Sequence, residues 1–272
     1  MRYQEFDPSP PFGAIVEKYW ILEGLPAAAF AKAGAASADW ECILPDGRAE
    51  LIFHYGDPFA RRSTGNRIDV QPSAMFVGQL TTPVCLRPRG MAGVAAIRLR
   101  PEATGMLGPT AAEVTNRFES LDQLARTTAV VEQLAAAAGD RDRIAVLEQF
   151  LSPIVKRQPR PDVAFAVDCL IRRGGAMSIA AVSTLAGVPR RQLERRFQSD
   201  VGISPKAFAR LLRVNRAARL ALAQRSLADV AAACGYVDQA HMSNDFRRLV
   251  QQSPHEWQRM AGTLGPLFVG AT

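Results

Sequence analysis

The sequence has no long hydrophobic run, and this absence excludes a membrane-spanning helix. None of its 272 residues belongs to an uncharged apolar stretch of the ~18 residues that a bilayer requires. The uncharged run Gly174–Pro189 is shorter and contains polar breaks. The segment Met1–Pro11 carries acidic residues and prolines without an apolar core, so no signal peptide is expected. We therefore expect a cytoplasmic protein with no membrane partner.

Cysteine and histidine are also scarce. The four cysteines, Cys42, Cys85, Cys169 and Cys234, stand far apart and form no Cys-x-x-Cys pair. Neither a disulfide framework nor a structural zinc site is expected from this spacing. The three histidines are scattered, and the sequence has no Gly-rich phosphate loop, no Gly-x-Ser-x-Gly and no His-Glu-x-x-His. These absences predict a protein that is not an enzyme and that holds no metal or cofactor.

Charge is abundant but unevenly distributed. Residues 1–155 hold 15 Lys and Arg against 18 Asp and Glu, whereas residues 156–272 hold 18 against 8. Of the 18 basic residues in the second half, 16 are Arg, which forms forked hydrogen bonds to phosphate and to guanine. A polyanionic partner is therefore expected for the second half alone.

Short apolar runs set off by turn residues predict β-strands in the first hundred residues, and their regular spacing is typical of a sandwich or barrel. Leu25–Asp39 and Asp57–Asn66 are expected to be loops. The predicted strands are Ala14–Leu22, Trp40–Leu44, Glu50–Tyr55, Ala74–Gln79, Val84–Leu86 and Gly93–Leu99.

Helical spacing replaces strand patterning after Pro101. It predicts two helices, Leu121–Ala138 and Arg141–Val155, which pack on the barrel, pair two chains, or both. The predicted organisation is a β-rich domain at 1–155, a linker at 156–161, an all-helical domain at 162–262 and a tail at 263–272.

The basic half repeats itself once. Each copy has the pattern of a short helix, a glycine turn, a second helix with an inward Phe, and a third helix opened by Ser-Pro, which is a helix-turn-helix arrangement. One residue is added in the turn after the second glycine. The matched residues are Ile179, Val182, Ala186, Gly187, Phe197, Ser204 and Pro205 in the first copy and Leu227, Val230, Cys234, Gly235, Phe246, Ser253 and Pro254 in the second.

A long helix, Ser204–Gln224, is predicted between the copies. As a helix it spans ~30 Å, close to the ~34 Å between successive major grooves on one face of DNA. This spacing predicts that the two recognition helices lie in adjacent major grooves and that the DNA site is asymmetric.

The stretch Ser178–Trp257 resembles the DNA-binding domain of the AraC/XylS family of bacterial transcriptional regulators. The resemblance is carried by Leu185–Phe197, Val201–Lys206 and Ala231–Arg247. Gln251 stands where the first copy, and often the family, has glycine, so an altered junction is expected there. The resemblance implies a transcription factor that acts with RNA polymerase and carries an N-terminal sensory or dimerising domain.

The first half is similar to a companion domain found in some members of that family. The similarity lies in Val16–Trp20, in Leu44–Gly47 with Glu50 and Leu51, and in Gly78 with Pro83. It implies a cupin-like β-barrel. The predicted fold class is α+β, with an N-terminal β-barrel followed by helices and an all-α C-terminal domain that contains two helix-turn-helix motifs.

The outward faces of the two second helices are the candidate contacts to double-stranded DNA. The resemblance implies that Arg191 and Arg195 reach base edges, where Arg can pair with guanine, and Gln and Asn can pair with adenine. Asp238 is expected to cap its helix, because phosphate repels a carboxylate. The predicted DNA-binding residues are Arg190, Arg191, Glu194, Arg195, Lys206, Gln239, His241, Ser243, Asn244 and Arg247.

The barrel interior is the candidate site for a small-molecule effector, whose binding would act on the DNA-binding half through Lys156–Pro161. Pockets combine apolar walls with a few polar groups. The candidate lining residues are Trp20, Trp40, Glu50, Phe53, His54 and Tyr55. A homodimer is expected in place of, or together with, an effector.

Two other functions stay open at this point. The DNA-binding module can be fused to an enzymatic domain or to a sensor that uses a reactive cysteine, with Cys42 or Cys85 as the candidate thiol. A binder without sequence preference is disfavoured, because the two outward helix faces differ in chemistry.

Overall fold

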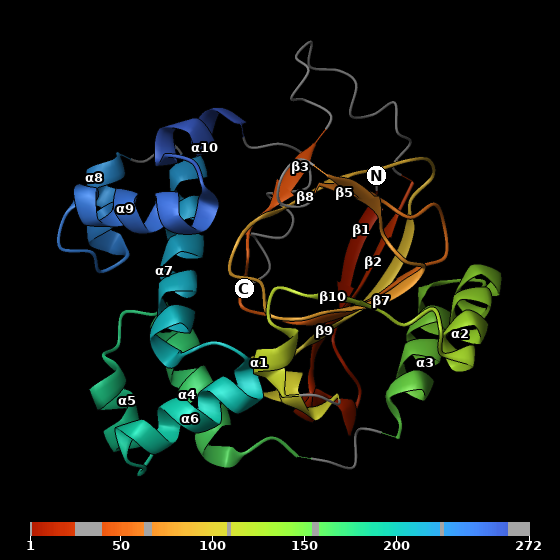
Figure 1. Cartoon of the computed structure of the whole chain (residues 1–272), viewed down its shortest axis with the longest axis horizontal. Coiled ribbons are helices and arrows are strands. Elements are labelled where there is room, and N and C mark those ends of the chain that lie inside the picture. The colour runs from red at the N-terminus through yellow and green to blue at the C-terminus, as the bar shows by residue number, and fades with distance from the viewer. Residues whose placement is uncertain are drawn as a thin grey trace.

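The computed structural model describes residues 2–24, 40–62, 67–107, 110–153, 158–223 and 226–260. The predicted loop Leu25–Asp39, the start of the predicted linker and the predicted tail lie outside the described residues. The chain is α+β as predicted, with β-sheets in the N-terminal half and helices in the C-terminal half (Figure 1).

Two antiparallel sheets form the N-terminal half. The larger has the order β1-β2-β9-β4-β7-β10 and the smaller the order β3-β8-β5-β6. The predicted β-barrel is open, because no ladder within the described residues joins the outer strands of either sheet. The strands are β1 Arg2–Phe6, β2 Val16–Glu23, β3 Glu41–Ile43, β4 Glu50–His54, β5 Ala60–Arg62, β6 Ile68–Val70, β7 Ala74–Val77, β8 Val84–Arg87, β9 Gly93–Leu99 and β10 Phe118–Ser120.

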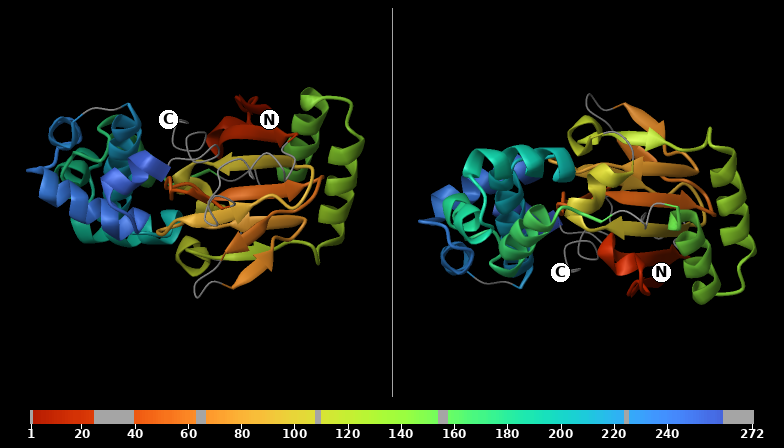
Figure 2. Two further views of the ribbon diagram at one scale, coloured as in Figure 1. Left: turned by 90° about the horizontal axis from the view of Figure 1, so that it is seen from above. Right: turned by 90° about the horizontal axis from the view of Figure 1, so that it is seen from below.

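The larger sheet is covered on both faces, and strand alternation decides which side chain meets which cover. Tyr19 and Ile21 face the core shared with α2 (Ala125–Ala136) and α3 (Asp140–Leu151). Trp20 and Leu22 alternate with these two residues along β2 and face the smaller sheet. Figure 2 shows α2 and α3 at the end of the molecule opposite the C-terminal helices. The remaining N-terminal elements are η1 Phe12–Ala14, η4 Pro101–Met106 and α1 Ala111–Val114.

Helix α7 organises the C-terminal half, because its two ends belong to two separate cores. Phe208 and Leu211 pack with α4, α5 and α6, whereas Val214 and Ala218 pack with α8, α9 and α10 (Figure 1). The described helices include none with the length and apolar character needed to cross a bilayer. The helices are α4 Pro161–Arg172, α5 Ile179–Leu185, α6 Arg190–Val201, α7 Pro205–Leu222, α8 Leu227–Ala233, α9 Gln239–Val250 and α10 Pro254–Met260.

The C-terminal end of α6 packs on η4 and α1 and so joins the two halves. Thr115 Oγ1 donates a hydrogen bond to the Gly202 carbonyl oxygen at 2.9 Å. Gly202 ends α6 at φ +96°, and an added Cβ there would lie 2.6 Å from Thr115 Oγ1. Glycine is required at this position both by the left-handed backbone and by the close approach of the N-terminal half.

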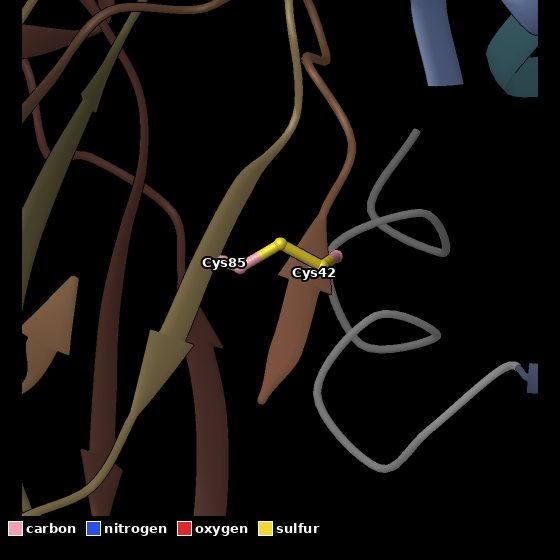
Figure 3. The surroundings of a disulfide bond; sticks show 2 residues. All are labelled: Cys42 and Cys85. Atoms are coloured by element: carbon pink, nitrogen blue, oxygen red, sulfur yellow. A yellow bond between two sulfur atoms is a disulfide. The ribbon is translucent and has the colours of Figure 1, made fainter. Parts of the chain in front are cut away.

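A disulfide joins Cys42 of β3 to Cys85 of β8 (Figure 3). The expectation of no disulfide is therefore wrong. The two cysteines are 43 residues apart in sequence but lie directly opposite in the β3–β8 ladder, with their Cα atoms 4.0 Å apart. The sequence spacing held no signal of this, because the pairing depends on the register of two short strands. Cys169 and Cys234 are free thiols.

Candidate functional site

The first helix-turn-helix motif consists of α5 and α6. Ser178 caps α5 by accepting a hydrogen bond from the backbone N–H of Ala181. In α6, Leu193 and Phe197 are fully buried, as predicted, and they anchor the helix on the core. The outward face carries exposed Arg190, Arg191 and Arg195 together with half-buried Glu194.

Not every arginine of α6 belongs to this outward face. Arg196 Nη1 lies 2.7 Å from Asp162 Oδ2 of α4, so this side chain holds two helices together. Arg190 Nε lies 2.8 Å from Glu194 Oε1 one turn away. Such an exposed pair contributes little stability, so Arg190 can exchange its partner for an external anion. Lys206, in the first turn of α7, is exposed.

The second motif consists of α8 and α9. Asp238 Oδ1 accepts a hydrogen bond of 2.7 Å from the backbone N–H of His241, which confirms the predicted capping role. Met242 and Phe246 are fully buried, as predicted. The outward face carries exposed Gln239, His241, Asn244 and Arg247 with half-buried Ser243. The two motifs therefore present different chemistry, mainly guanidinium groups on α6 and mainly amide, hydroxyl and imidazole groups on α9.

Two features of the second motif were missed by the sequence analysis. Asp245 is buried in α9, and its carboxylate lies 3.3 Å from Arg210 Nε and 3.7 Å from Arg213 Nη2 of α7. This contact fixes α9 on the helix that carries both motifs. The sequence does indicate that Asp245 faces inward, because it stands three residues after the inward-facing Met242 and so lies on the same face of the helix. The second feature, Val237, is 88% exposed in the turn before α9.

An apolar hollow lies between the two sheets, and three of the six residues predicted for an effector pocket line it. Trp20, Glu50 and His54 point into this hollow from the inner face of the larger sheet. Phe59, Leu86 and Phe118 are among the apolar side chains around them. The cavity volume of this hollow is about 70 Å³, which is below the usual range for small-molecule sites.

The structure places the other three predicted pocket residues outside the lining of this hollow. Phe53 packs edge-on against Phe150 of α3, with ring centroids 5.2 Å apart. The Tyr55 hydroxyl donates to Glu23 Oε1 at 2.8 Å. Trp40 lies under the guanidinium groups of Arg62 and Arg87. The prediction is corrected for these three. Residues 53 and 55 alternate with residues 50, 52 and 54 and face the opposite side of the sheet, whereas the Trp40 ring is covered by the two arginines.

The loop Leu44–Arg48 belongs to both halves of the molecule. Leu44, Pro45, Asp46 and Arg48 line the hollow. Leu44 also packs in the core of α7, α8, α9 and α10, and the Pro45 carbonyl accepts a 2.6 Å hydrogen bond from Asn215 Nδ2 of α7. Gly47, at φ +84°, leaves room for the Phe208 ring, which an added Cβ would approach to 2.7 Å.

The described residues contain no group of three or more His, Cys, Asp or Glu side chains placed to hold a metal ion. Burial lowers the pKa of His54 to about 4. Its imidazole is therefore neutral near pH 7 and adds no positive charge to the hollow.

Comparison with known families gives two matches that divide the chain. Residues 182–260 match the family described as "Helix-turn-helix domain". Residues 4–119 match the family described as "Domain of unknown function (DUF6597)".

Curated relatives match the C-terminal half. The HTH-type transcriptional regulator MtrA of Neisseria gonorrhoeae is 35% identical over 78 residues, which are 28% of this chain and 26% of MtrA. The probable transcriptional regulator LumQ of Photobacterium leiognathi is 35% identical over 83 residues, which are 30% of this chain and 34% of LumQ. The matched region thus spans about a quarter to a third of the length of these relatives.

Solved structures similar to this chain include a transcriptional regulator with an AraC-type DNA-binding domain from Chromobacterium violaceum. It is 29% identical, with a TM-score of 0.36, over 39% of this chain and 96% of that one. ToxT of Vibrio cholerae O395 is 11% identical, with a TM-score of 0.49, over 82% of this chain and 95% of ToxT. From the family match and the two motifs described above, residues 182–260 of this chain form a helix-turn-helix domain.

Proposed function

We propose that this chain is a sequence-specific transcriptional regulator that binds double-stranded DNA in the cytoplasm. The observation that carries the proposal is the pair of helix-turn-helix motifs at the two ends of α7, whose outward faces differ. A surface that recognises phosphate alone needs only positive charge, whereas amide and guanidinium groups on recognition helices can read base edges.

The exposed side chains divide into two roles under this proposal. Arg191 and Arg195 of α6, and Gln239 and Asn244 of α9, reach base edges and select the sequence. The remaining predicted contacts bind phosphates, support the base-reading side chains, or fix the helices on the duplex. This second group consists of Arg190, Glu194, Lys206, His241, Ser243 and Arg247.

The test is selection of DNA sites by the full chain from random duplexes at a fixed salt concentration. Helix α7 has 18 residues and spans about 27 Å. The expected product is an asymmetric site with two boxes about one helical turn apart. Arg195→Ala is expected to relax one box and Asn244→Ala the other, each by about 1–3 kcal/mol.

Arg141→Ala is the matched control for loss of one exposed positive charge, because Arg141 lies in α3 at the far end of the molecule. This variant should select the same site with the same affinity. The proposed base contacts are refuted if DNA binding depends on salt but not on sequence. In that case all three variants would bind every DNA sequence with equal affinity.

The N-terminal half is proposed to sense a small molecule in the hollow between its sheets. Support comes from the loop Leu44–Arg48, which lines the hollow and also contacts α7. A ligand that moves this loop would change how α7 and both motifs are held. This route is proposed beside the predicted linker route through Lys156–Pro161, part of which lies outside the described residues. The proposal also includes a homodimer and a contact with RNA polymerase.

A second candidate function is thiol-based sensing, which the Cys42–Cys85 pair favours. Cytosolic disulfides are usually transient and redox-sensing. With glutathione disulfide as oxidant, the two thiols form one S–S bond and the oxidant leaves as two glutathione thiols. DNA affinity measured in reduced and in oxidised glutathione buffers tests this function, because an affinity that is equal in both buffers excludes it.

A further inference from the structure

A second cavity lies on the face of the larger sheet that is opposite the hollow, between this sheet and helices α2 and α3. One wall is a row of three side chains, because Leu51 of β4 and Glu119 of β10 both pair directly with Phe76 of β7. Directly paired residues point to the same face of a sheet. The adjacent pair Phe118 and Val77 lines the hollow instead. The cavity and the hollow are therefore separated by the sheet.

The inner part of this cavity is apolar. Val114 of α1, Leu107 at the end of η4 and Phe150 of α3 add apolar walls to the sheet face. Thr104 also lines the cavity, but its hydroxyl group already donates a hydrogen bond of 2.9 Å to the Pro101 carbonyl oxygen. The cavity volume is about 170 Å³, and an apolar cavity of about 150 Å³ takes up a benzene ring. The inner part therefore has room for one small hydrocarbon group.

The opening of the cavity carries one charge of each sign. Glu119 and Arg126 line the cavity and are exposed, whereas Phe76 and Phe150 behind them are buried. The guanidinium of Arg126 lies over the Phe150 ring, with its Cζ 4.7 Å from the ring centroid. Arg126 has no ion-pair partner among the described residues. Because a stacked guanidinium keeps the N–H groups at its edge available, Arg126 can bind a carboxylate.

Glu119 is available to a cation in the same way. Its Oε1 lies 3.7 Å from Arg117 Nη1, and the two side chains are 49% and 66% exposed. Such an exposed pair contributes little stability, so Glu119 can exchange Arg117 for an ammonium group. Asp122, in the loop after β10, accepts a hydrogen bond from the backbone N–H of Ala74. Arg117 and Asp122 add one further charge of each sign, so a ligand with a single charge meets both attraction and repulsion.

We propose that this cavity binds a free α-amino acid with an apolar side chain of about the size of leucine. Its carboxylate binds Arg126 and its ammonium group binds Glu119, so the charged groups stay at the opening. Its hydrocarbon side chain lies against Phe76, Val114 and Phe150. This site is separate from the hollow, and the inference does not depend on the sensor function proposed for the hollow.

The inner wall of the cavity also belongs to the part of the N-terminal half that contacts the first recognition helix. Val114 directly precedes Thr115, whose hydroxyl group donates a hydrogen bond to the Gly202 carbonyl oxygen at the end of α6. In η4, Gly105 packs so closely on α6 that an added Cβ would lie 2.8 Å from the Ser199 carbonyl oxygen. A ligand that fills the cavity therefore packs on the segments that hold the C-terminal end of α6.

The test uses L-leucine and three probes that each lack one part of it. The acid 4-methylpentanoate lacks the amino group, 3-methylbutan-1-amine lacks the carboxylate, and glycine lacks the side chain. Their affinities for the full chain are measured by ligand-observed NMR near pH 7 without DNA. Leucine is expected to bind about fivefold more tightly than either singly charged probe, because each lacks one exposed ion pair, and glycine most weakly. A singly charged probe that binds as tightly as leucine, or no leucine binding at about 10 mM, overturns the proposal.

Two variants at exposed positions are expected to change the charge preference in opposite directions. Glu119→Gln should weaken leucine binding and strengthen binding of the acid, each about fivefold, because the attraction and the repulsion are both removed. Arg126→Gln should weaken leucine binding and strengthen binding of the amine. Glu132→Gln in α2 and Arg141→Gln in α3 are the matched exposed controls and should change no affinity.

A folded variant that loses affinity for all the probes alike would show that the altered residue only supports the cavity, and it overturns the assignment of that residue. If a variant does not fold, the ranking of the four probes on the unaltered chain decides the question alone.

Hydrogen exchange at the end of α6 tests whether the cavity is coupled to the first motif. When half of the sites hold leucine, the Gly202 amide is expected to exchange about twofold more slowly, whereas glycine at the same concentration should have no effect. Leucine binding with unchanged exchange supports the site and refutes the coupling. Selection of the expected DNA site by a chain that does not bind leucine refutes the amino-acid site and supports the proposed regulator.

Discussion

Asn215 of α7 donates a hydrogen bond of 2.6 Å from Nδ2 to the carbonyl oxygen of Pro45. The same Nδ2 atom lies 3.0 Å from the Leu211 carbonyl oxygen one helical turn earlier, which fixes the direction of the amide. Because Pro45 lines the hollow and α7 carries both motifs, this bond joins the candidate sensor directly to the DNA-binding helices.

Asn215→Ala is expected to loosen the loop Leu44–Arg48. A buried carbonyl that loses its donor costs about 1 kcal/mol, so backbone amides of the loop should exchange hydrogen about fivefold faster. Hydrogen exchange read by mass spectrometry measures this effect. Gln133→Ala, an exposed amide on α2, is the control and should leave the loop unchanged. Equal exchange in both variants would show that Asn215 does not hold the loop.

Reduction of the Cys42–Cys85 disulfide is expected to lower the stability of the N-terminal half. A cross-link between residues 43 positions apart stabilises by about 4 kcal/mol in the chain-entropy model. Cys42→Ser should therefore unfold at a lower urea concentration than the oxidised parent and should no longer respond to reductant. Cys169→Ser, at a free thiol, is the control and should keep the response to reductant. A parent that unfolds identically with and without reductant contradicts the prediction.

The N-terminal half shows what a single sequence leaves undetermined. Turn residues located β2, β4, β7, β8 and β9 within a few residues. Which strands pair is decided by contacts between distant segments, so neither the two open sheets nor the disulfide register could be obtained from spacing. Part of the pocket error was avoidable, since strand alternation already separates Glu50 and His54 from Phe53 and Tyr55.

The C-terminal half was predicted more completely, because its signals are local. The internal repeat, the glycine turns and the caps Ser204 and Asp238 are all determined within a few residues of sequence. Whether the predicted base contacts are correct is not decided by exposure alone and stays a prediction. The contacts between the halves, such as Asn215 with Pro45, join segments 170 residues apart and left no pattern in the sequence.

The junction at Gln251 keeps the geometry of its counterpart Gly202. Both residues end a recognition helix in the left-handed conformation, at φ +60° for Gln251 and +96° for Gly202. The expected altered junction is therefore absent from the backbone. A non-glycine residue pays about 1 kcal/mol for this conformation, so Gln251→Gly is expected to stabilise the C-terminal half by about that amount. Urea unfolding measures the change.

Gly202→Ala is the counterpart of that variant and should have the opposite effect. Its added Cβ would clash with Thr115 Oγ1 and with the Ala111 carbonyl oxygen, and alanine would be strained at this positive φ. Loss of stability on Gln251→Gly would contradict the prediction and would show that the Gln251 side chain makes a stabilising contact.

Val237 is expected to read a thymine in the second box of the DNA site. It is the residue added in the second turn, it is 88% exposed, and it directly precedes Asp238, the cap of α9. Recognition helices contact bases through their N-terminal residues, and thymine is the one base with a methyl group in the major groove. Val237 belongs to neither of the hydrophobic cores that the described residues of the C-terminal half form.

The measurement replaces each thymine of the second box in turn by deoxyuridine, which lacks only the methyl group. At the contacted position the unaltered chain should lose about fourfold in affinity, which is the value of one buried methyl. Val237→Ala should bind thymine and deoxyuridine equally there, because the methyl has lost its partner. Leu185→Ala removes another exposed apolar side chain, in the first motif, and should keep the discrimination. The affinity loss from Val237→Ala and the loss from deoxyuridine can also be measured together. If the two losses add in full, Val237 does not contact the methyl group and the prediction is wrong.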